Sequence, residues 1–148
     1  MGRKILVING PNLNFLGRRN PLVYGYDTYE DLVNLVEREA AERGISVDCF
    51  QSNYEGALID RLQKAAEEGV DGVIINPGAL THYSYALYDC LLDVPAPKIE
   101  VHLTDIYNRE VFRRTSVTAP ACETMIMRMG MDGYVAAMDR LIEIWGEE

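Results

Sequence analysis

The sequence predicts an α/β protein in which helices cover both faces of a parallel β-sheet. Short apolar runs typical of buried strands, such as residues 5–8 and 73–75, alternate along the chain with longer stretches of helical periodicity. The chain has 148 residues, of which 48% are hydrophobic and 25% charged. This length suffices for one globular domain, residues 1–148, with a core that needs no disulfide or metal.

Strands and helices follow one another along the chain in five units. A helix is predicted from Thr28 to about Arg43, because Thr28 can cap it, Asp31 stands at the capping-box position and Gly44 can end it. The remaining strands are predicted over residues 45–51, 73–75, 98–102 and 124–129. The remaining helices are predicted after a cap at Ser52 and Asn53, over residues 84–92 and over residues 131–145, with a short helix near residues 108–114.

Five such units in a chain of this length favour a flavodoxin-like three-layer sandwich, with a five-stranded parallel sheet of order 2-1-3-4-5. In that order strands 1 and 3 are neighbours, and strand 4 lies next to strand 3. Abrupt polar turns follow these three strands, the first two being Asn9-Gly10-Pro11-Asn12 and Asn76-Pro77-Gly78. The turns are therefore expected to converge on one crevice at the carboxyl edge of the sheet.

The first connection, residues 9–27, is unusually long and carries Arg18, Arg19 and Tyr24. An ordinary strand-to-helix connection has about 2–6 residues, so this loop is predicted to be functional. Tyrosine is a poor base unless a cation stabilises its phenolate, and Arg19 is close enough in sequence to do so. A mobile polar loop whose tyrosine merely packs over the crevice is the alternative interpretation.

The chain has two histidines, His82 and His102, and both follow predicted strand ends at the crevice. This placement favours a functional role, although a single histidine is more often structural. Glu100 stands two residues before His102, so the two side chains share one face of the strand and the carboxylate can orient the imidazole. A surface carboxylate at a strand end remains the alternative for Glu100.

Composition and motifs exclude several classes of function. The net charge of −9 argues against nucleic-acid or anionic-membrane binding, and no window approaches the roughly 18 apolar residues of a membrane span. The N-terminal residues do not form a signal peptide, and three cysteines in apolar stretches suit a reducing compartment, so a cytoplasmic protein is expected. Nucleotide-binding glycine motifs and a G-x-S-x-G elbow are absent from the sequence.

Metal and imine chemistry are also disfavoured. The candidate ligands His82, Asp89, Glu100 and His102 lack the helical spacing of known metal sites. The three lysines fall at strand starts or within a helix, away from the crevice. An acid–base site made of a tyrosine, arginines, histidines and amides is what remains.

Seven motifs follow one another along the chain: Asn9-Gly10-Pro11-Asn12-Leu13-Asn14, Gly17-x-Arg19-x-Pro21-x-x-Tyr24-Gly25, Gln51-Ser52-Asn53-x-Glu55-Gly56, Ile75-Asn76-Pro77-Gly78-Ala79-x-Thr81-His82, Glu100-Val101-His102-Leu103, Arg109-Glu110-x-Phe112-Arg113 and Gly133-Tyr134. In these motifs and in their order the sequence resembles type II 3-dehydroquinate dehydratase over essentially its whole length. The resemblance implies reversible loss of water from 3-dehydroquinate, giving 3-dehydroshikimate, with no metal or organic cofactor. It fits the shikimate pathway and quinate breakdown alike.

The resemblance also implies roles for individual residues. Tyr24 would be the general base, assisted by Arg19, and Asn12 would help stabilise an enolate. His102, oriented by Glu100, would be the general acid for the departing hydroxyl. The small anionic substrate would be held by a further set of groups: Asn76, His82, Arg113 and the backbone amides of Leu103 and Thr104. Asp89 would reach the site of a neighbouring subunit, because members of this family form trimers assembled into dodecamers.

Two other functions stay open at this point. One is a different metal-free enolising enzyme, such as an isomerase of a small anionic ketone that uses the same base and acid. The other is a flavodoxin-like module without catalytic activity, since a fold alone implies no function. Turnover of 3-dehydroquinate distinguishes the first alternative from the dehydratase, and the convergent histidines argue against the second.

Overall fold

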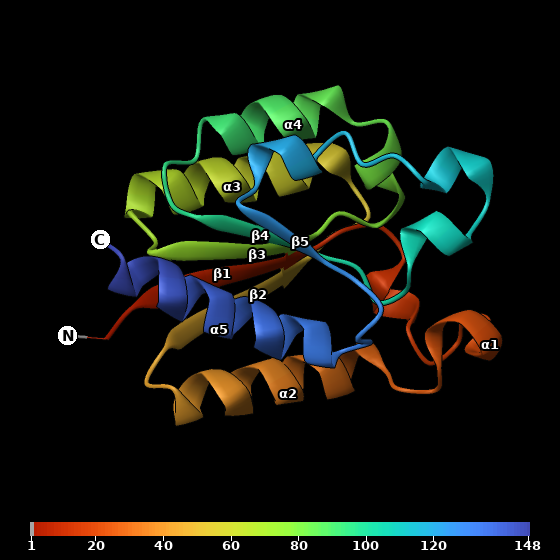
Figure 1. Cartoon of the computed structure of the whole chain (residues 1–148), viewed down its shortest axis with the longest axis horizontal. Helices are drawn as coiled ribbons and strands as arrows, with labels where there is room; N and C mark the ends of the chain where they lie inside the picture. Colours follow the sequence, from red (N-terminus) through yellow and green to blue (C-terminus); the bar gives the residue numbers. More distant parts are fainter. Residues whose placement is uncertain (1) are drawn as a thin grey trace.

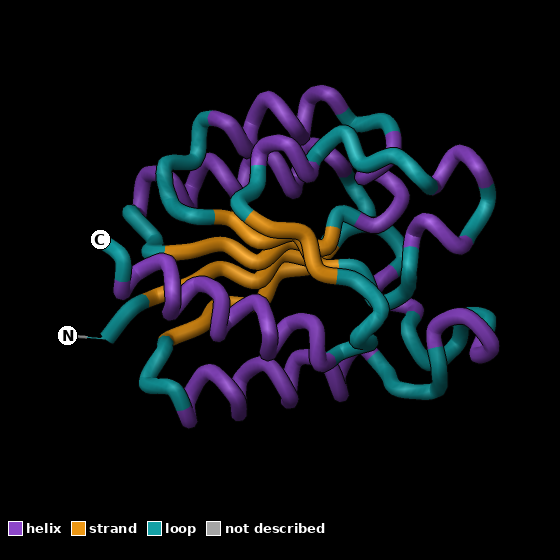
Figure 2. Tube along the Cα trace, in the orientation of Figure 1, coloured by secondary structure: helices purple, strands orange, loops and turns teal. Residues whose placement is uncertain are grey.

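The computed structural model describes residues 2–148, and these form one parallel sheet of five strands. The strands are β1 (Lys4–Asn9), β2 (Ser46–Gln51), β3 (Gly72–Asn76), β4 (Lys98–Val101) and β5 (Thr124–Ile126). Their order is β2-β1-β3-β4-β5 and each neighbouring pair is parallel, as predicted. The carboxyl ends of the strands therefore lie at one edge of the sheet (Figure 2).

Helices cover both faces of the sheet and complete the predicted flavodoxin-like sandwich (Figure 1). α3 (Glu55–Glu68) and α4 (Tyr85–Leu92) lie on one face, and α2 (Tyr29–Glu42) and α5 (Asp132–Gly146) lie on the other. Alternate side chains of β1 enter two cores: Ile5 and Val7 pack with α2 and α5, whereas Leu6 and Ile8 pack with α3 and α4. Burial on both faces explains why this strand is a continuous apolar run.

The predicted capping of α2 is confirmed, whereas the connection before it is more ordered than predicted. The Thr28 hydroxyl accepts the backbone N–H of Asp31, and the Asp31 carboxylate accepts that of Thr28, which completes a capping box. In the long loop after β1, α1 (Pro21–Tyr24) forms one helical turn. It begins there because the Asn20 side chain accepts the backbone N–H of Leu22 and proline suits the first helical position.

Other local predictions were wrong. Ser52 and Asn53 do not cap α3, since Asn53 instead accepts the backbone N–H of Asn12 over 2.9 Å. The predicted helix near residues 108–114 is two short 3₁₀ turns, Ile106–Asn108 and Val111–Arg113. β5 ends before residue 129 because residues 128 and 130 adopt positive φ angles, which a strand excludes.

The turns after β1 and β3 pack directly against each other. The backbone N–H of Gly10 donates to the carbonyl oxygen of Asn76 over 2.8 Å. A Cβ on Gly10 would lie 2.3 Å from the carbonyl oxygen of Pro77, and one on Gly78 would lie 2.8 Å from that of Pro11. Glycine is thus required at both turns. The close contact between the two turns determines the positions of Asn12 and Asn76 at the carboxyl edge of the sheet.

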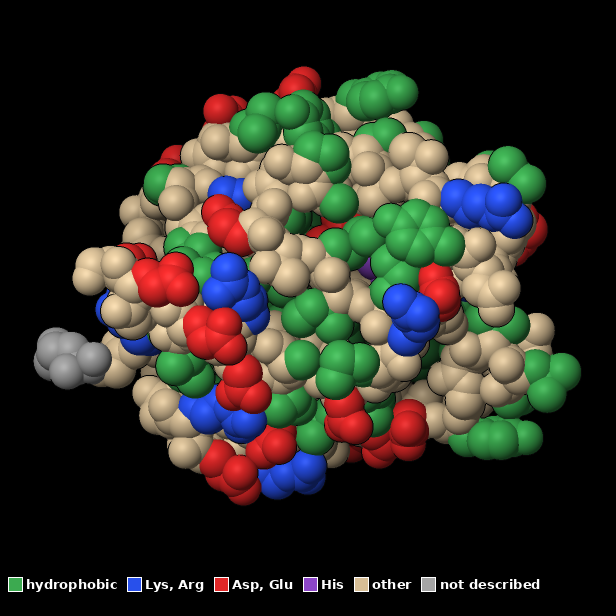
Figure 3. All heavy atoms as spheres, in the orientation of Figure 1, with side chains coloured by type: hydrophobic (Ala, Val, Ile, Leu, Met, Phe, Trp, Pro, Cys, Tyr) green, Lys and Arg blue, Asp and Glu red, His purple; other side chains and the backbone are tan. Residues whose placement is uncertain are grey.

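The outer surface carries charge of both signs. Acidic and basic side chains lie side by side over α2 and α5 (Figure 3), where Arg43 Nε and Asp139 Oδ1 are 2.8 Å apart. The start of β1 and the end of α5 lie together at the end of the sheet opposite the carboxyl edge (Figure 1). None of the helices within residues 2–148 is long and apolar enough to cross a membrane.

Replacing Gly10 with alanine is expected to lower the free energy of unfolding by about 1–3 kcal/mol, the usual cost of overpacking. The added methyl group would clash with the Pro77 carbonyl, which the paired turn holds in place. Gly56→Ala in α3 is the matched control, because a Cβ there meets no atom within 4 Å. Urea denaturation measures both, and equal stability of the two variants would contradict the packing argument.

Candidate active site

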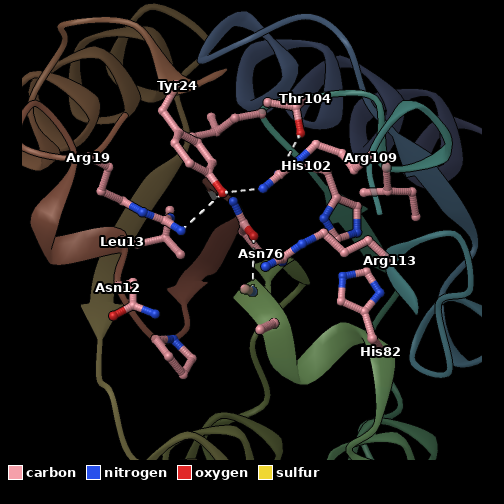
Figure 4. A pocket seen from close by; sticks show the side chains of 15 residues that line it. Asn12, Leu13, Arg19, Tyr24, Asn76, His82, His102, Thr104, Arg109 and Arg113 are labelled. Atoms are coloured by element: carbon pink, nitrogen blue, oxygen red, sulfur yellow. Dashed lines mark hydrogen bonds between the residues drawn. The ribbon is translucent and has the colours of Figure 1, made fainter. Parts of the chain in front are cut away.

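A pocket lies at the carboxyl edge of the sheet, where the segments after β1, β3 and β4 converge (Figure 4). Its lining comprises Pro11, Asn12, Leu13, Arg19, Tyr24, Asn76, Gly78, Ala79, His82, His102, Leu103, Thr104, Ile106, Arg109 and Arg113. All of the site residues predicted from the sequence are among these except Glu100 and Asp89. Glu100 lies behind His102, and Asp89 is exposed on α4, outside the pocket.

Tyr24 lies between two arginines in this pocket (Figure 4). Nη2 of Arg19 and Nη2 of Arg109 each donate to its hydroxyl oxygen over 3.0 Å. The Arg19 guanidinium also lies over the aromatic ring, 3.9 Å from its centroid. Two charged donors therefore converge on one oxygen, an arrangement that favours negative charge at that position.

Arg109 is the charged residue of the pocket lining that was missing from the predicted set. It lies between the two 3₁₀ turns after β4 and reaches a tyrosine 85 positions earlier in the chain. Its guanidinium is 3.7 Å from the Glu110 carboxylate. Only its place in the motif Arg109-Glu110-x-Phe112-Arg113 could have indicated it, because the surrounding sequence has no helical or strand periodicity.

His102 and Glu100 form a buried pair. Nε2 of His102 lies 2.8 Å from Oε2 of Glu100, whose side chain has no exposed surface. A carboxylate only accepts hydrogen bonds, so Nε2 carries a proton and the imidazole presents Nδ1 as its other nitrogen. When His102 is protonated, Nδ1–H becomes an acid at the pocket wall, supported by the negative charge behind it.

His82 lies on the wall near Arg113 (Figure 4). Its Nδ1 is 2.8 Å from the carbonyl oxygen of Thr115, which can only accept, so Nδ1 is the donor. Burial lowers the pKa of His82, and the hydrogen bond to Thr115 offsets part of that effect. The ring is therefore neutral near pH 7, and Nε2 is left as an acceptor for a ligand hydroxyl.

Asn76 is held by a chain of buried hydrogen bonds. Its Nδ2 donates to the Tyr134 hydroxyl over 3.2 Å, which donates to Oδ1 of Asn9 over 2.5 Å. Oδ1 of Asn76 accepts the backbone N–H of Gly78 over 3.2 Å. Complete burial raises the pKa of Tyr134, so its hydroxyl keeps its proton and the direction of the chain is defined. These bonds fix which way the Asn76 amide faces.

The pocket gathers positive charge in an acidic protein. Arg19, Arg109 and Arg113 all line it, although the chain as a whole carries −9. Within residues 2–148, no group of three or more His, Cys, Asp or Glu side chains is placed to hold a metal ion. The fold and these side chains define a flavodoxin-like α/β protein with a pocket of tyrosine, histidine, amide and arginine side chains, whose positive charge suits a small anion.

Comparison with known proteins identifies the family. Residues 3–142 match the family described as dehydroquinase class II. A 3-dehydroquinate dehydratase of Lachnospira eligens is 51% identical over 142 residues, covering 95% of this chain and 97% of its own length. The type II dehydroquinase structure from Butyrivibrio crossotus superposes with a TM-score of 0.94 at 51% identity, covering 95% of this chain and 98% of that one. The type II dehydroquinase structure from Propionibacterium acnes gives 0.93 at 38% identity, over 97% and 98%. The chain belongs to the class II dehydroquinase family.

The lowered pKa of His82 predicts how stability depends on pH. The ordinary value is 6.5 and the folded value is lower, so between the two the unfolded chain binds more protons than the folded protein. Stability is expected to fall as pH decreases through this window. Titration of the His82 ring by NMR should give a midpoint below 6.5. In His82→Gln this part of the pH dependence of unfolding should disappear. A wild-type His82 midpoint above 6.5 would refute the prediction.

Proposed function

We propose that the protein removes water from 3-dehydroquinate to give 3-dehydroshikimate, by acid–base elimination through an enolate and without imine or metal. One observation carries the mechanism: a tyrosine oxygen with two arginine donors lies in the same pocket as a histidine backed by a buried carboxylate. A base and an acid are thereby held in surroundings of opposite charge. Membership of the family supports the choice of substrate.

The first step is removal of a proton from the carbon next to the ketone. Tyr24 takes the proton as a phenolate, whose charge Arg19 and Arg109 stabilise until the transfer. The electron pair of the broken C–H bond moves into the ring, giving a carbon–carbon double bond and an enolate oxygen. Asn12, on the pocket wall, helps to stabilise that oxygen, directly or through a water molecule.

The second step expels the hydroxyl group. The enolate reforms the ketone, and its electron pair displaces the hydroxyl on the next carbon. His102 donates its Nδ1 proton to that oxygen, so that water leaves, while Glu100 supports the imidazolium through Nε2. The product is a ketone conjugated with a new double bond. Tyr24 ends the reaction protonated and His102 ends it neutral.

Other pocket groups bind and orient the substrate. Asn76 and Arg113 hold ring hydroxyls, and His82 accepts from one through Nε2. The backbone amides of Leu103 and Thr104 hold the carboxylate. A small anion of this kind suits the three arginines, whereas the net charge of −9 disfavours nucleic acid. We also propose a cytoplasmic location, which suits free cysteines.

The enzyme is expected to convert 3-dehydroquinate, and Tyr24→Phe should lose most of this turnover. Loss of a positioned general base lowers kcat by about 10²–10⁴, and because the arginines act on the Tyr24 oxygen, Arg109→Ala should also lower kcat. Combining the two substitutions should cost little more than Tyr24→Phe alone. Absorbance of the conjugated product gives the rate.

Arg18→Ala is the matched control for these variants. Arg18 belongs to the same loop, but its guanidinium lies over the Phe15 ring, 5.5 Å from the centroid, rather than in the pocket. This variant should keep wild-type kcat. Wild-type protein that fails to consume 3-dehydroquinate would overturn the substrate, and near-normal turnover by Tyr24→Phe would overturn the mechanism.

We propose further that Asp89 completes the pocket of a neighbouring copy, in trimers that assemble into a dodecamer. The Asp89 side chain is exposed on α4 and lies outside its own pocket. Exposed aromatic rings lie close by in sequence, with Tyr83 63% and Tyr85 71% accessible. Tyrosine is one of the residue types that are enriched at protein–protein interfaces.

Mixed oligomers are expected to reveal this sharing of sites. Asp89→Asn chains and Tyr24→Phe chains should each have low activity alone, but refolding them together should restore some sites that contain both native residues. The control is each variant refolded by itself under the same conditions. Sedimentation showing an active monomer, or a mixture no more active than the average of its two components, would refute the shared site.

A further inference from the structure

Glu100 is an ionisable group held in the centre of the sheet. It lies on β4 between Ile75 of β3 and Met125 of β5, and its side chain has no exposed surface. A buried carboxylate is costly unless it is paired and hydrogen-bonded. Among residues 2–148, the one ion-pair partner of Glu100 is His102. Because His102 gives this carboxylate one hydrogen bond, at Oε2, the other hydrogen bonds of Glu100 decide how well its negative charge is stabilised.

Two hydroxyl groups supply those hydrogen bonds. Ser116 Oγ donates to Oε2 over 2.7 Å, and Thr118 Oγ1 donates to Oε1. The two hydroxyl oxygens are also 3.2 Å apart, but each hydroxyl has a single proton, and the shorter contact with a negatively charged oxygen favours donation to the carboxylate. Ser116 Oγ also accepts the backbone N–H of Ala119 over 2.9 Å, which fixes the direction in which its own proton points. Oε2 thus receives Ser116 together with His102, and Oε1 receives Thr118.

The segment that carries these hydroxyls is tied to the other pocket histidine. The Thr115 carbonyl accepts Nδ1–H of His82 over 2.8 Å, and the backbone N–H of Val117 donates to the carbonyl of Thr81 over 2.8 Å. Thr118 itself is fully buried. Residues 115–118 are therefore anchored to Thr81 and His82, and their hydroxyls cannot turn away from Glu100 without breaking these two hydrogen bonds.

We propose that Ser116 and Thr118 are positioning residues for the acid of the reaction. The inference rests on the proposed function, in which His102 protonates the departing hydroxyl. If the Nε2 proton moved to Glu100, His102 would be left as a neutral imidazole, whose remaining N–H is a far weaker acid. The two hydroxyls stabilise the carboxylate and thereby keep that proton on Nε2. They also hold Oε2 in the direction that turns Nδ1 to the pocket.

Removing one hydroxyl while keeping the side-chain shape tests this role. Thr118→Val should lower kcat by about 10- to 100-fold, the range expected for a hydrogen bond to a charged group. KM for 3-dehydroquinate should change little, since neither Glu100 nor Thr118 lines the pocket. Thr118→Ser restores the hydroxyl and should recover most of kcat. Ser116→Ala should lower kcat in the same way.

The matched control is Thr115→Val, which makes the same chemical change in the same segment. Its side chain is exposed, and only its backbone carbonyl is used by the site. This variant should keep wild-type kcat and KM. If Thr118→Val does not fold, Ser116→Ala, whose site is less buried, decides the question by itself.

The outcomes separate this inference from the proposed function. Wild-type turnover together with unchanged kcat in Thr118→Val and Ser116→Ala would overturn the positioning role alone, even if both variants lost stability. A rise in KM with constant kcat in both variants would also overturn the positioning role, because this result would assign Ser116 and Thr118 to substrate binding. Absence of turnover by the wild type would overturn the proposed function, and this inference with it.

Discussion

The site depends on the parallel pairing of β1 with β3, which places Asn9 beside Asn76 at the carboxyl edge of the sheet. Beyond these residues the two turns pack so closely that Gly10 has no room for a Cβ. The fully buried Tyr134 of α5 bridges the two residues, because its hydroxyl donates to Oδ1 of Asn9 and accepts from Nδ2 of Asn76. Both the long loop with its tyrosine and the turn that leads to His82 start from this rigid point.

Charge divides the pocket into two environments. Around Tyr24 there are guanidinium donors, which stabilise an anion, and behind His102 there is a buried carboxylate, which stabilises a cation. Groups in such opposed surroundings suit the roles of base and acid within one reaction. The protein reaches this arrangement against a net charge of −9, because its acidic residues are spread over the outer helices while arginines gather at the pocket.

The predictions that succeeded were those that depend on local patterns or on strand order. Thr28 and Asp31 form their capping box within one turn of helix, and the apolar runs of β1 and β3 need only burial to be strands. The predicted cap of α3 at Asn53 was wrong, because the Asn53 side chain accepts the backbone N–H of Asn12 on another loop instead. Competition of this kind between a near and a distant partner leaves no mark in the neighbouring sequence.

The sequence by itself indicated the order of strands and the crevice, because the alternation of strands and helices and the polar turns after strands 1, 3 and 4 predict both. It offered the pairing of Glu100 with His102 from their spacing on one strand, but the burial of Glu100 in the folded protein decided between this pairing and a surface carboxylate. The motifs also indicated the family and most of the residues in the pocket. Only the tertiary structure decided that Arg109 reaches Tyr24 across 85 positions, and that Ser116 and Thr118 hold Glu100. These residues lie in a segment without regular periodicity, so their directions depend on which distant groups the folded chain brings within hydrogen-bonding distance.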